Sequence, residues 1–241
     1  MNKMTIMGIW LLSLFINSGC NRELVEYDSN DLKISIEKGE EWMHDFPLFL
    51  GINKKNPPQI AIWTEDMEGH YLSTIYVTHK IATQSWQASG GNRRKEALPH
   101  WCYQRGIQYE DGLYLPTKKE PLTDGITGAT PKGSFNVKMS PTGKLKKFIV
   151  KIEINHSTDF NDAYPKSAKE GDANYSGGKE GSGQPALVYV TEIDLASGEK
   201  EFVANLIGHS SPDGSNGNIT KDTSSLTTAL HIVKKITICT Q

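Results

Sequence analysis

Short stretches in which apolar and polar residues alternate run through most of this 241-residue sequence. The clearest is Lys147–Asn155, whose apolar residues occupy every second position: Phe148, Val150, Ile152 and Ile154. Successive side chains of a β-strand point to opposite faces, so this period predicts a strand with one buried face. The same kind of pattern predicts strands at Leu32–Ile36, Pro47–Ile52, Gln59–Thr64, Tyr71–Thr78, Ser134–Ser140, Ala186–Ile193, Phe202–Gly208 and Ile236–Cys239.

Short strands joined by tight turns are typical of a β-sandwich. We therefore expect one all-β domain over residues 32–241, an antiparallel, immunoglobulin-like sandwich with one or two short helices. Three of the turns end in glycine, which favours hairpins: Glu65–Gly69, Pro141–Gly143 and Ala196–Gly198. The candidate helices are Arg94–Gln104, with Pro99 tolerated only near its first turn, and Ser225–Lys235.

The pattern of residues 1–19 predicts a secretory signal peptide rather than part of the folded domain. A positive N-terminal end precedes the apolar run Ile6–Ile16, which is shorter than the roughly 20 residues of a membrane-spanning helix. Small residues before Cys20 resemble a bacterial lipobox, so Cys20 is the expected lipidation site and 20–31 a polar tether. Asn17 stands where an aliphatic residue is usual, and ordinary cleavage nearby without a lipid is the alternative. The expected location is periplasmic or at the cell surface, anchored to a membrane.

The charge is nearly balanced, with 26 lysine and arginine residues against 28 aspartate and glutamate residues. Nucleic-acid binding needs a net basic face, so this class of partner is not expected. The sequence has no Gly-x-Ser-x-Gly motif and no closely spaced histidine or cysteine pairs of the kind that bind zinc or haem. A stand-alone hydrolytic enzyme is therefore not expected.

The three cysteines divide unequally, because lipidation would occupy Cys20. Cys102 and Cys239 remain. In an exported protein they can form one disulfide that closes a long loop, worth up to about 4–5 kcal/mol in the chain-entropy model, or stay as buried free thiols.

A glycine-rich segment without strand pattern, His156–Pro185, interrupts the series of strands. Structureless loops of this length are uncommon inside a domain and are usually functional or disordered. We expect a surface excursion beside the sandwich, since strands lie on both sides of it. Its polar side chains at His156, Asp159, Asn161 and Asp162 lack the glycine of an EF-hand loop, so a solvated polar loop is favoured over a metal site.

The segment Asp124–Thr130, Asp-Gly-Ile-Thr-Gly-Ala-Thr, carries the sharpest functional signal. It fits the pattern Asp-x-x-(Ser/Thr)-Gly-Ala-(Ser/Thr), which resembles the sites at which a flavin transferase links FMN through a phosphoester bond. The resemblance implies covalent attachment at the last residue, Thr130. The other matching residues are Asp124, Thr127, Gly128 and Ala129.

The residue types of this segment suit the attachment of a phosphate group to a threonine hydroxyl. A hydroxyl must approach phosphorus in line, which small neighbours permit, and it needs a base or metal for activation. A tight loop before the next strand is the alternative interpretation, because glycine and proline are also the residues that favour turns. An aromatic ring could stack on the flavin, and Trp101 is the best candidate among Trp63, Trp86 and Trp101, with core packing as the alternative.

Segments around this motif resemble an exported bacterial family known as domain of unknown function 2271. The resemblance runs from about Gln59 to Lys235 and rests on Gln59–Asp66, Gly69, Ala97–Trp101, Asp124–Pro131, Ser182–Pro185 and Leu226–Ala229. It implies a periplasmic or surface protein that accompanies flavin transferases and PepSY-type membrane redox proteins. The long glycine-rich segment and the lipobox-like start depart from many members.

The sequence thus favours a lipid-anchored sandwich that carries covalent FMN at Thr130 and passes electrons between membrane and extracytoplasmic partners. One alternative is a cofactor-free binding module that uses loops 156–185 and 208–218. Another is an assembly subunit in which Thr130 lies in a structural turn.

Overall fold

The computed structural model describes residues 32–47, 53–86, 93–122, 126–140 and 145–240, and the structural findings concern these residues. The expected signal peptide, the tether and Cys20 lie outside them, as does Asp124.

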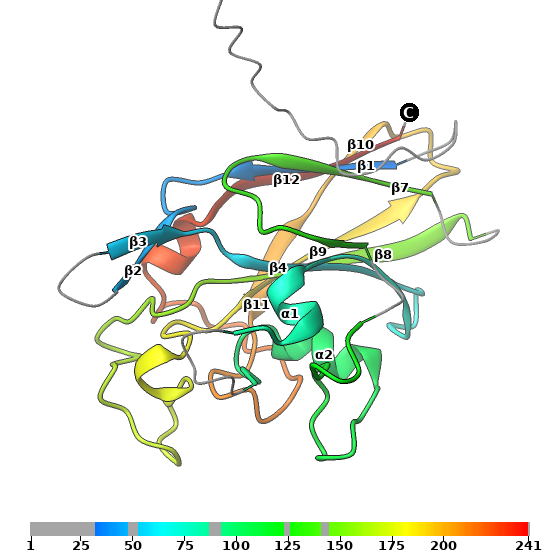
Figure 1. Cartoon of the computed structure of the whole chain (residues 1–241). Helices are drawn as coiled ribbons and strands as arrows, with labels where there is room; N and C mark the ends of the chain where they lie inside the picture. The colour runs from blue at the N-terminus through cyan, green and yellow to red at the C-terminus, as the bar shows by residue number, and fades with distance from the viewer. Residues whose placement is uncertain (1–31, 48–52, 87–92, 123–125, 141–144, 241) are drawn as a thin grey trace, which may run out of the picture.

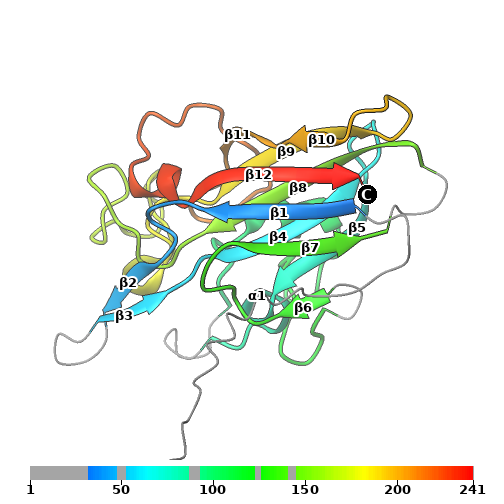
Figure 2. The same cartoon turned by 90° about the horizontal axis from the view of Figure 1, so that it is seen from above.

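Two β-sheets face each other and form a sandwich (Figures 1 and 2). The four-stranded sheet has the order β10-β12-β1-β7, with bounds Glu201–Val203, Val233–Thr240, Leu32–Lys38 and Phe135–Met139. The six-stranded sheet has the order β11-β9-β8-β4-β5-β6, with bounds Asn205–His209, Leu187–Asp194, Lys147–Asn155, Gln59–Glu65, Tyr71–Thr78 and Ile126–Gly128. The predicted all-β sandwich is confirmed. One pairing departs from the antiparallel expectation, because β6 runs parallel to β5.

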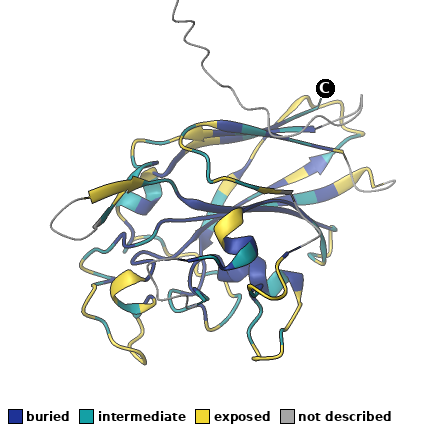
Figure 3. Cartoon of the chain, viewed as in Figure 1, coloured by how far each residue is buried: buried dark blue, intermediate teal, exposed yellow. Residues whose placement is uncertain are grey.

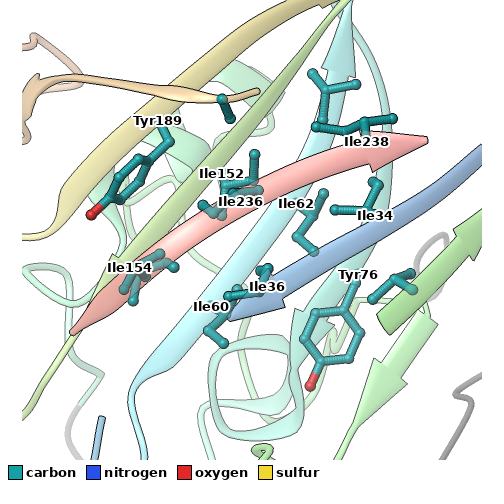
Figure 4. Packing of buried hydrophobic residues seen from close by; sticks show 14 of the residues in the cluster. Ile34, Ile36, Ile60, Ile62, Tyr76, Ile152, Ile154, Tyr189, Ile236 and Ile238 are labelled. Carbon is teal, nitrogen blue, oxygen red and sulfur yellow. The ribbon is translucent and has the colours of Figure 1, made fainter. Parts of the chain in front are cut away.

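The main core lies between the two sheets (Figure 4). Ile34 and Ile36 of β1 pair with Ile238 and Ile236 of β12, and all four side chains are buried. They face the inward side chains of the six-stranded sheet, which include Ile60, Ile62, Tyr76, Ile152, Ile154 and Tyr189. Branched aliphatic residues suit this pleated, two-layer packing because their side chains stand stiffly above the strand.

A second core covers the outer face of the six-stranded sheet (Figure 3). Two short helices, α1 (His79–Thr83) and α2 (Pro99–Arg105), lie against this face together with the loops around them (Figure 1). Helix α2 begins at Pro99 and ends at Arg105, and it is capped by Gly106, which has a φ of 68°. Proline suits the first helical position because its missing N–H has no partner there, and glycine tolerates the left-handed cap.

Several element boundaries differ from the sequence prediction. The segment Ser225–Lys235 is a 3₁₀ turn, η3 (Thr228–His231), followed by the start of β12, because Val233 is needed in the four-stranded sheet. The predicted strand Phe202–Gly208 is two strands in different sheets, β10 and β11. Strands β2 (His44–Pro47) and β3 (Asn53–Asn56) pair as a separate two-stranded sheet, and residues 48–52 of the predicted strand Pro47–Ile52 lie outside the described part.

The long glycine-rich segment is buried at its two ends, around Asp159 and Ser182, while residues 169–173 in its middle are exposed. Its backbone pairs with itself, since Thr158 and Asp159 donate their N–H groups to the carbonyls of Gly181 and Ser182 at 2.7 and 2.9 Å. A Cβ atom at Gly183 would lie 2.3 Å from the backbone of Asp159, so this close approach requires glycine. A short 3₁₀ turn, η2 (Gly178–Glu180), lies within the segment.

Candidate functional site

The FMN-type motif lies where the chain crosses from one sheet to the other. Strand β6 is the last strand of the six-stranded sheet, and β7 is the last strand of the four-stranded sheet. The connection between them, residues 129–134, therefore runs along one edge of the sandwich (Figure 2). Thr127 is exposed on β6, Gly128 ends that strand and Thr130 lies in the connection.

Two buried aromatic side chains hold this connection by its backbone. The hydroxyl of Tyr76 donates to the carbonyl oxygen of Ala129 at 3.4 Å. The indole N–H of Trp42 donates to the carbonyl oxygen of Pro131 at 3.0 Å. Thr130 therefore lies between two anchored carbonyl groups, and neither of these contacts uses its side chain.

The edge is accessible to solvent and carries positive charge. Ala129 is exposed and Thr130 is half-buried. Lys132 is exposed two residues further on, and the side chain of Lys38 passes close to Gly133. The connection that carries Thr130 therefore has two lysine side chains beside it, and cations of this kind attract phosphate.

Trp101 does not lie at this edge and is a core residue. It is fully buried in the second core, and its indole N–H donates to Thr74 Oγ1 at 3.0 Å. The guanidinium of Arg105 covers the ring at 5.0 Å from its centre. These contacts leave no ring face for a flavin, which corrects the expectation of stacking by Trp101 and supports the core-packing alternative. Trp63 and Trp86 are buried as well.

A buried group of polar side chains on the outer face of the six-stranded sheet was missed by sequence reasoning. Glu65 of β4 is fully buried, and Lys151 of β8 has only 13% of its side chain exposed. The ammonium Nζ of Lys151 lies 2.9 Å from Glu65 Oε2 and 3.3 Å from His100 Nε2. Alternation predicts that Lys151 faces solvent, whereas α2 covers it. The sequence contained one signal of this burial: Ala61 and Trp63 are apolar although they lie on the outer face of β4. Strands that are covered on both faces lose the clean alternation of apolar and polar residues.

Glu153 lies beside this group and anchors α2. Its two carboxylate oxygens accept the backbone N–H groups of His100 at 3.2 Å and Trp101 at 2.7 Å. Burial raises the pKa of Glu153 to about 7, against the opposing effect of these donors. Burial lowers the pKa of His100 to about 4, so its ring is neutral at neutral pH.

A second buried polar group joins the glycine-rich segment to the rest of the fold. Asp159 is 2% exposed and accepts a hydrogen bond from Thr228 Oγ1 at 2.5 Å. The amide of Gln184 donates to the same Thr228 hydroxyl, and its carbonyl accepts the N–H of Thr227 at 2.6 Å. Two segments that carried the family resemblance, 182–185 and 226–229, therefore pack against each other. The expected solvated polar loop is wrong at Asp159, which is buried.

His44 approaches Asp159 from β2. Its Nε2 lies 3.2 Å from the carbonyl oxygen of Thr158, which can only accept, so Nε2 carries the hydrogen. Its Nδ1 lies 3.9 Å from Asp159 Oδ1. In a neutral ring that nitrogen has a lone pair facing the carboxyl group, so the pair is attractive only when it holds an extra proton. Burial raises the pKa of Asp159, which favours sharing of that proton.

Three further expectations from the sequence concern the cysteines, metal binding and membrane-spanning helices in the described part of the chain. Cys102 is buried in α2 and Cys239 is half-buried in β12, and both are free thiols, so the bridged alternative is not what the structure has. No cluster of three histidine, cysteine or acidic residues suited to a metal ion occurs among the described residues. None of the described helices combines the length and the apolar character needed to cross a bilayer.

Comparison with known proteins gives no family model, no curated protein and no solved structure that matches this chain.

Proposed function

We propose that Thr130 is a site of covalent FMN attachment through a phosphoester bond. The observation that carries the proposal is the position of Thr130, half-buried between two anchored carbonyl groups at a solvent-accessible sheet edge, with no hydrogen bond from its side chain to another of the described residues. A modifying enzyme can approach such a residue without opening the core. Bound FMN would supply one- and two-electron redox chemistry.

The residues around Thr130 suit a phosphoester. Gly128 and Ala129 are small, so they leave room for in-line approach of the hydroxyl to phosphorus. Lys132 and Lys38 offer positive charge to the phosphate. The tryptophans of the described residues are buried, so the flavin ring would lie against the surface of the protein or of a partner rather than on an indole.

The wider proposal is an exported electron carrier rather than a stand-alone enzyme. The signal peptide and Cys20 would tether the sandwich to a membrane by lipid. A flavin transferase would load the cofactor, and a PepSY-type membrane redox protein would exchange electrons with it. These partners follow from the resemblance to the domain of unknown function 2271 family.

The test is co-expression of the secreted chain with a flavin transferase, followed by intact mass and visible absorbance. Wild type should gain one FMN less one water and absorb as a flavin. Thr130→Ala should gain nothing, while Ser167→Ala, a change at an exposed hydroxyl outside the motif, should still be modified. Modification of Thr130→Ala, or an unmodified wild type beside a modified control substrate, would refute the proposal.

A cofactor-free binding module is a second candidate, and the glycine-rich segment favours it. Asp159 Oδ2 is buried without a hydrogen-bond partner among the described residues, next to Thr158, whose φ of 61° is strained for a β-branched residue. Strain and an unsatisfied buried acceptor are typical of binding sites. Ligand-observed NMR with small amines and polyols, with Asp159→Asn as the matched variant, tests it. Binding to wild type that Asp159→Asn loses is expected, and equal binding to both would contradict it.

A further inference from the structure

Glu65 and Lys151 form an unusually enclosed ion pair. They lie on adjacent strands, β4 and β8, and both side chains point to the outer face beneath α2. Their side chains are 0% and 13% exposed, and Nζ lies 2.9 Å from Oε2. Despite this short distance, Oε2 has no partner with hydrogen-bond geometry among the described residues. The lysine nitrogen is therefore close to the carboxyl group without being aligned as a hydrogen-bond donor to it.

The other carboxylate oxygen of Glu65 faces two fixed donors. The indole N–H of Trp63 lies 2.7 Å from Oε1, and the amide nitrogen of Gln104 lies 3.0 Å from it. Donors aimed at one oxygen stabilise negative charge that develops there when a nucleophile adds to the carbon. Trp63 is fully buried and Gln104 is part of α2, so both donors are held by the fold.

His100 supplies a base next to the lysine nitrogen. Its Nδ1 lies 2.7 Å from the carbonyl oxygen of Gly217, so Nδ1 carries the hydrogen of the neutral ring. Its Nε2 therefore presents a lone pair to Lys151 Nζ, 3.3 Å away. The low pKa of His100 keeps the ring neutral, so this lone pair is free.

We propose that Lys151 and Glu65 become joined by an intramolecular amide bond, with His100 as the general base. The ammonium of Lys151 first gives a proton to the Glu65 carboxylate, which leaves a neutral amine and a carboxylic acid. The amine nitrogen then adds to Cδ of Glu65 while Trp63 and Gln104 stabilise the negative charge on Oε1.

The remaining steps form the amide and release one water molecule. One nitrogen-bound proton passes through His100 to the hydroxyl group on Cδ, the C–O bond breaks, and water leaves. The three ammonium protons end as one amide hydrogen and the two hydrogens of water, and His100 is unchanged. No oxidant, reductant or activating nucleotide is required.

The environment favours this product over the ion pair. Removing two charges from water costs free energy, and their mutual attraction offsets this cost only when the hydrogen-bond geometry is good. Oε2 of Glu65 lacks that geometry. The amide is neutral, and its water is released to bulk solvent. Fixed proximity also removes the entropy cost that makes the same reaction slow in solution.

Intact mass spectrometry and peptide mapping of the folded protein test the proposal. The wild-type chain should be lighter than its sequence by one water, and trypsin should fail to cleave after Lys151. The map should contain one branched peptide that joins Lys151 to Glu65. Mapping is needed because Asp-Gly sequences such as Asp111-Gly112 can also lose water, and a loss confined to those places would overturn the proposal.

The molecule contains its own control in Lys147 and Asp194. Their Nζ–Oδ2 distance is 2.8 Å, yet their side chains are 61% and 32% exposed. This pair should remain unlinked in the same digest. Linkage of both pairs would show a chemical artefact and overturn the assignment to a built site.

Two variants complete the design. Lys151→Met should have its full sequence mass, and His100→Gln should leave most of the chain unlinked, since general base catalysis typically contributes about 100-fold or more. Full linkage in His100→Gln would contradict the role of His100. The decisive result does not depend on the folding of either variant, because a folded wild-type chain with no missing water overturns the proposal by itself.

Discussion

Replacing Glu153 by glutamine tests how the second core tolerates a buried acid. The side chain is fully buried, and its two oxygens accept the N–H groups of His100 and Trp101 at the start of α2. Its pKa is raised from an ordinary value of 4.5 to about 7, chiefly by burial. The folded protein therefore binds this proton more tightly than the unfolded chain does.

The sign and size of the effect follow from that shift. A folded-state pKa above the unfolded value means that the contribution of Glu153 to the free energy of unfolding falls as pH rises from about 4.5 to about 7 and is flat above. One pKa unit corresponds to about 1.4 kcal/mol, so between about pH 5 and pH 8 wild type should lose roughly 2–3 kcal/mol from this residue. Glu153→Gln should not show this loss.

The assay is urea unfolding followed by tryptophan fluorescence at both pH values, for wild type and Glu153→Gln. Every other titrating group is common to the two proteins, so the difference in their pH dependence isolates this residue. Glu192→Gln, an exposed change on the neighbouring strand β9, is the matched control and should follow wild type. Parallel pH dependence of wild type and Glu153→Gln would refute the reasoning.

Three further outcomes are expected. Burial lowers the pKa of His156 to about 4, so this residue should reduce the free energy of unfolding as pH falls from about 6.5 to about 4. In urea unfolding, His156→Gln should remove about 2–3 kcal/mol of that loss, and an unchanged dependence of stability on acid pH would contradict this. Gly39→Ala should destabilise by about 3 kcal/mol or more, because its Cβ would lie 2.0 Å from the carbonyl oxygen of His231, whereas Gly133→Ala, with only a 3.9 Å contact, should be near neutral. Trp42→Phe should cost about 2 kcal/mol and increase proteolysis between β6 and β7, since the bond to the Pro131 carbonyl is lost; unchanged proteolysis would show that this bond does not hold the connection.

The strands were predictable because their pattern is local. Tyr71–Thr78 and Lys147–Asn155 match the expected bounds of β5 and β8, and the strands at Gln59 and Phe135 differ by one residue at their ends. Period-two alternation with β-branched residues specifies an extended strand without reference to the rest of the fold.

The buried polar groups were not predictable in the same way. Lys151 and Glu153 alternate with apolar residues as solvent-facing side chains do, and their burial depends on α2, which is far away in the sequence. The burial of Asp159 depends likewise on Thr228. The expectation for Trp101 failed for another reason: its position in the sequence before the motif did not reveal that α2 buries its ring in the second core.

The most direct test of the central proposal is the mass of the chain after exposure to a flavin transferase. We expect the wild-type protein to gain a single FMN through the Thr130 hydroxyl, located by peptide mapping, and the Thr130→Ala chain to stay unmodified. An unmodified wild-type chain, in a reaction that flavinylates a control substrate, would contradict it.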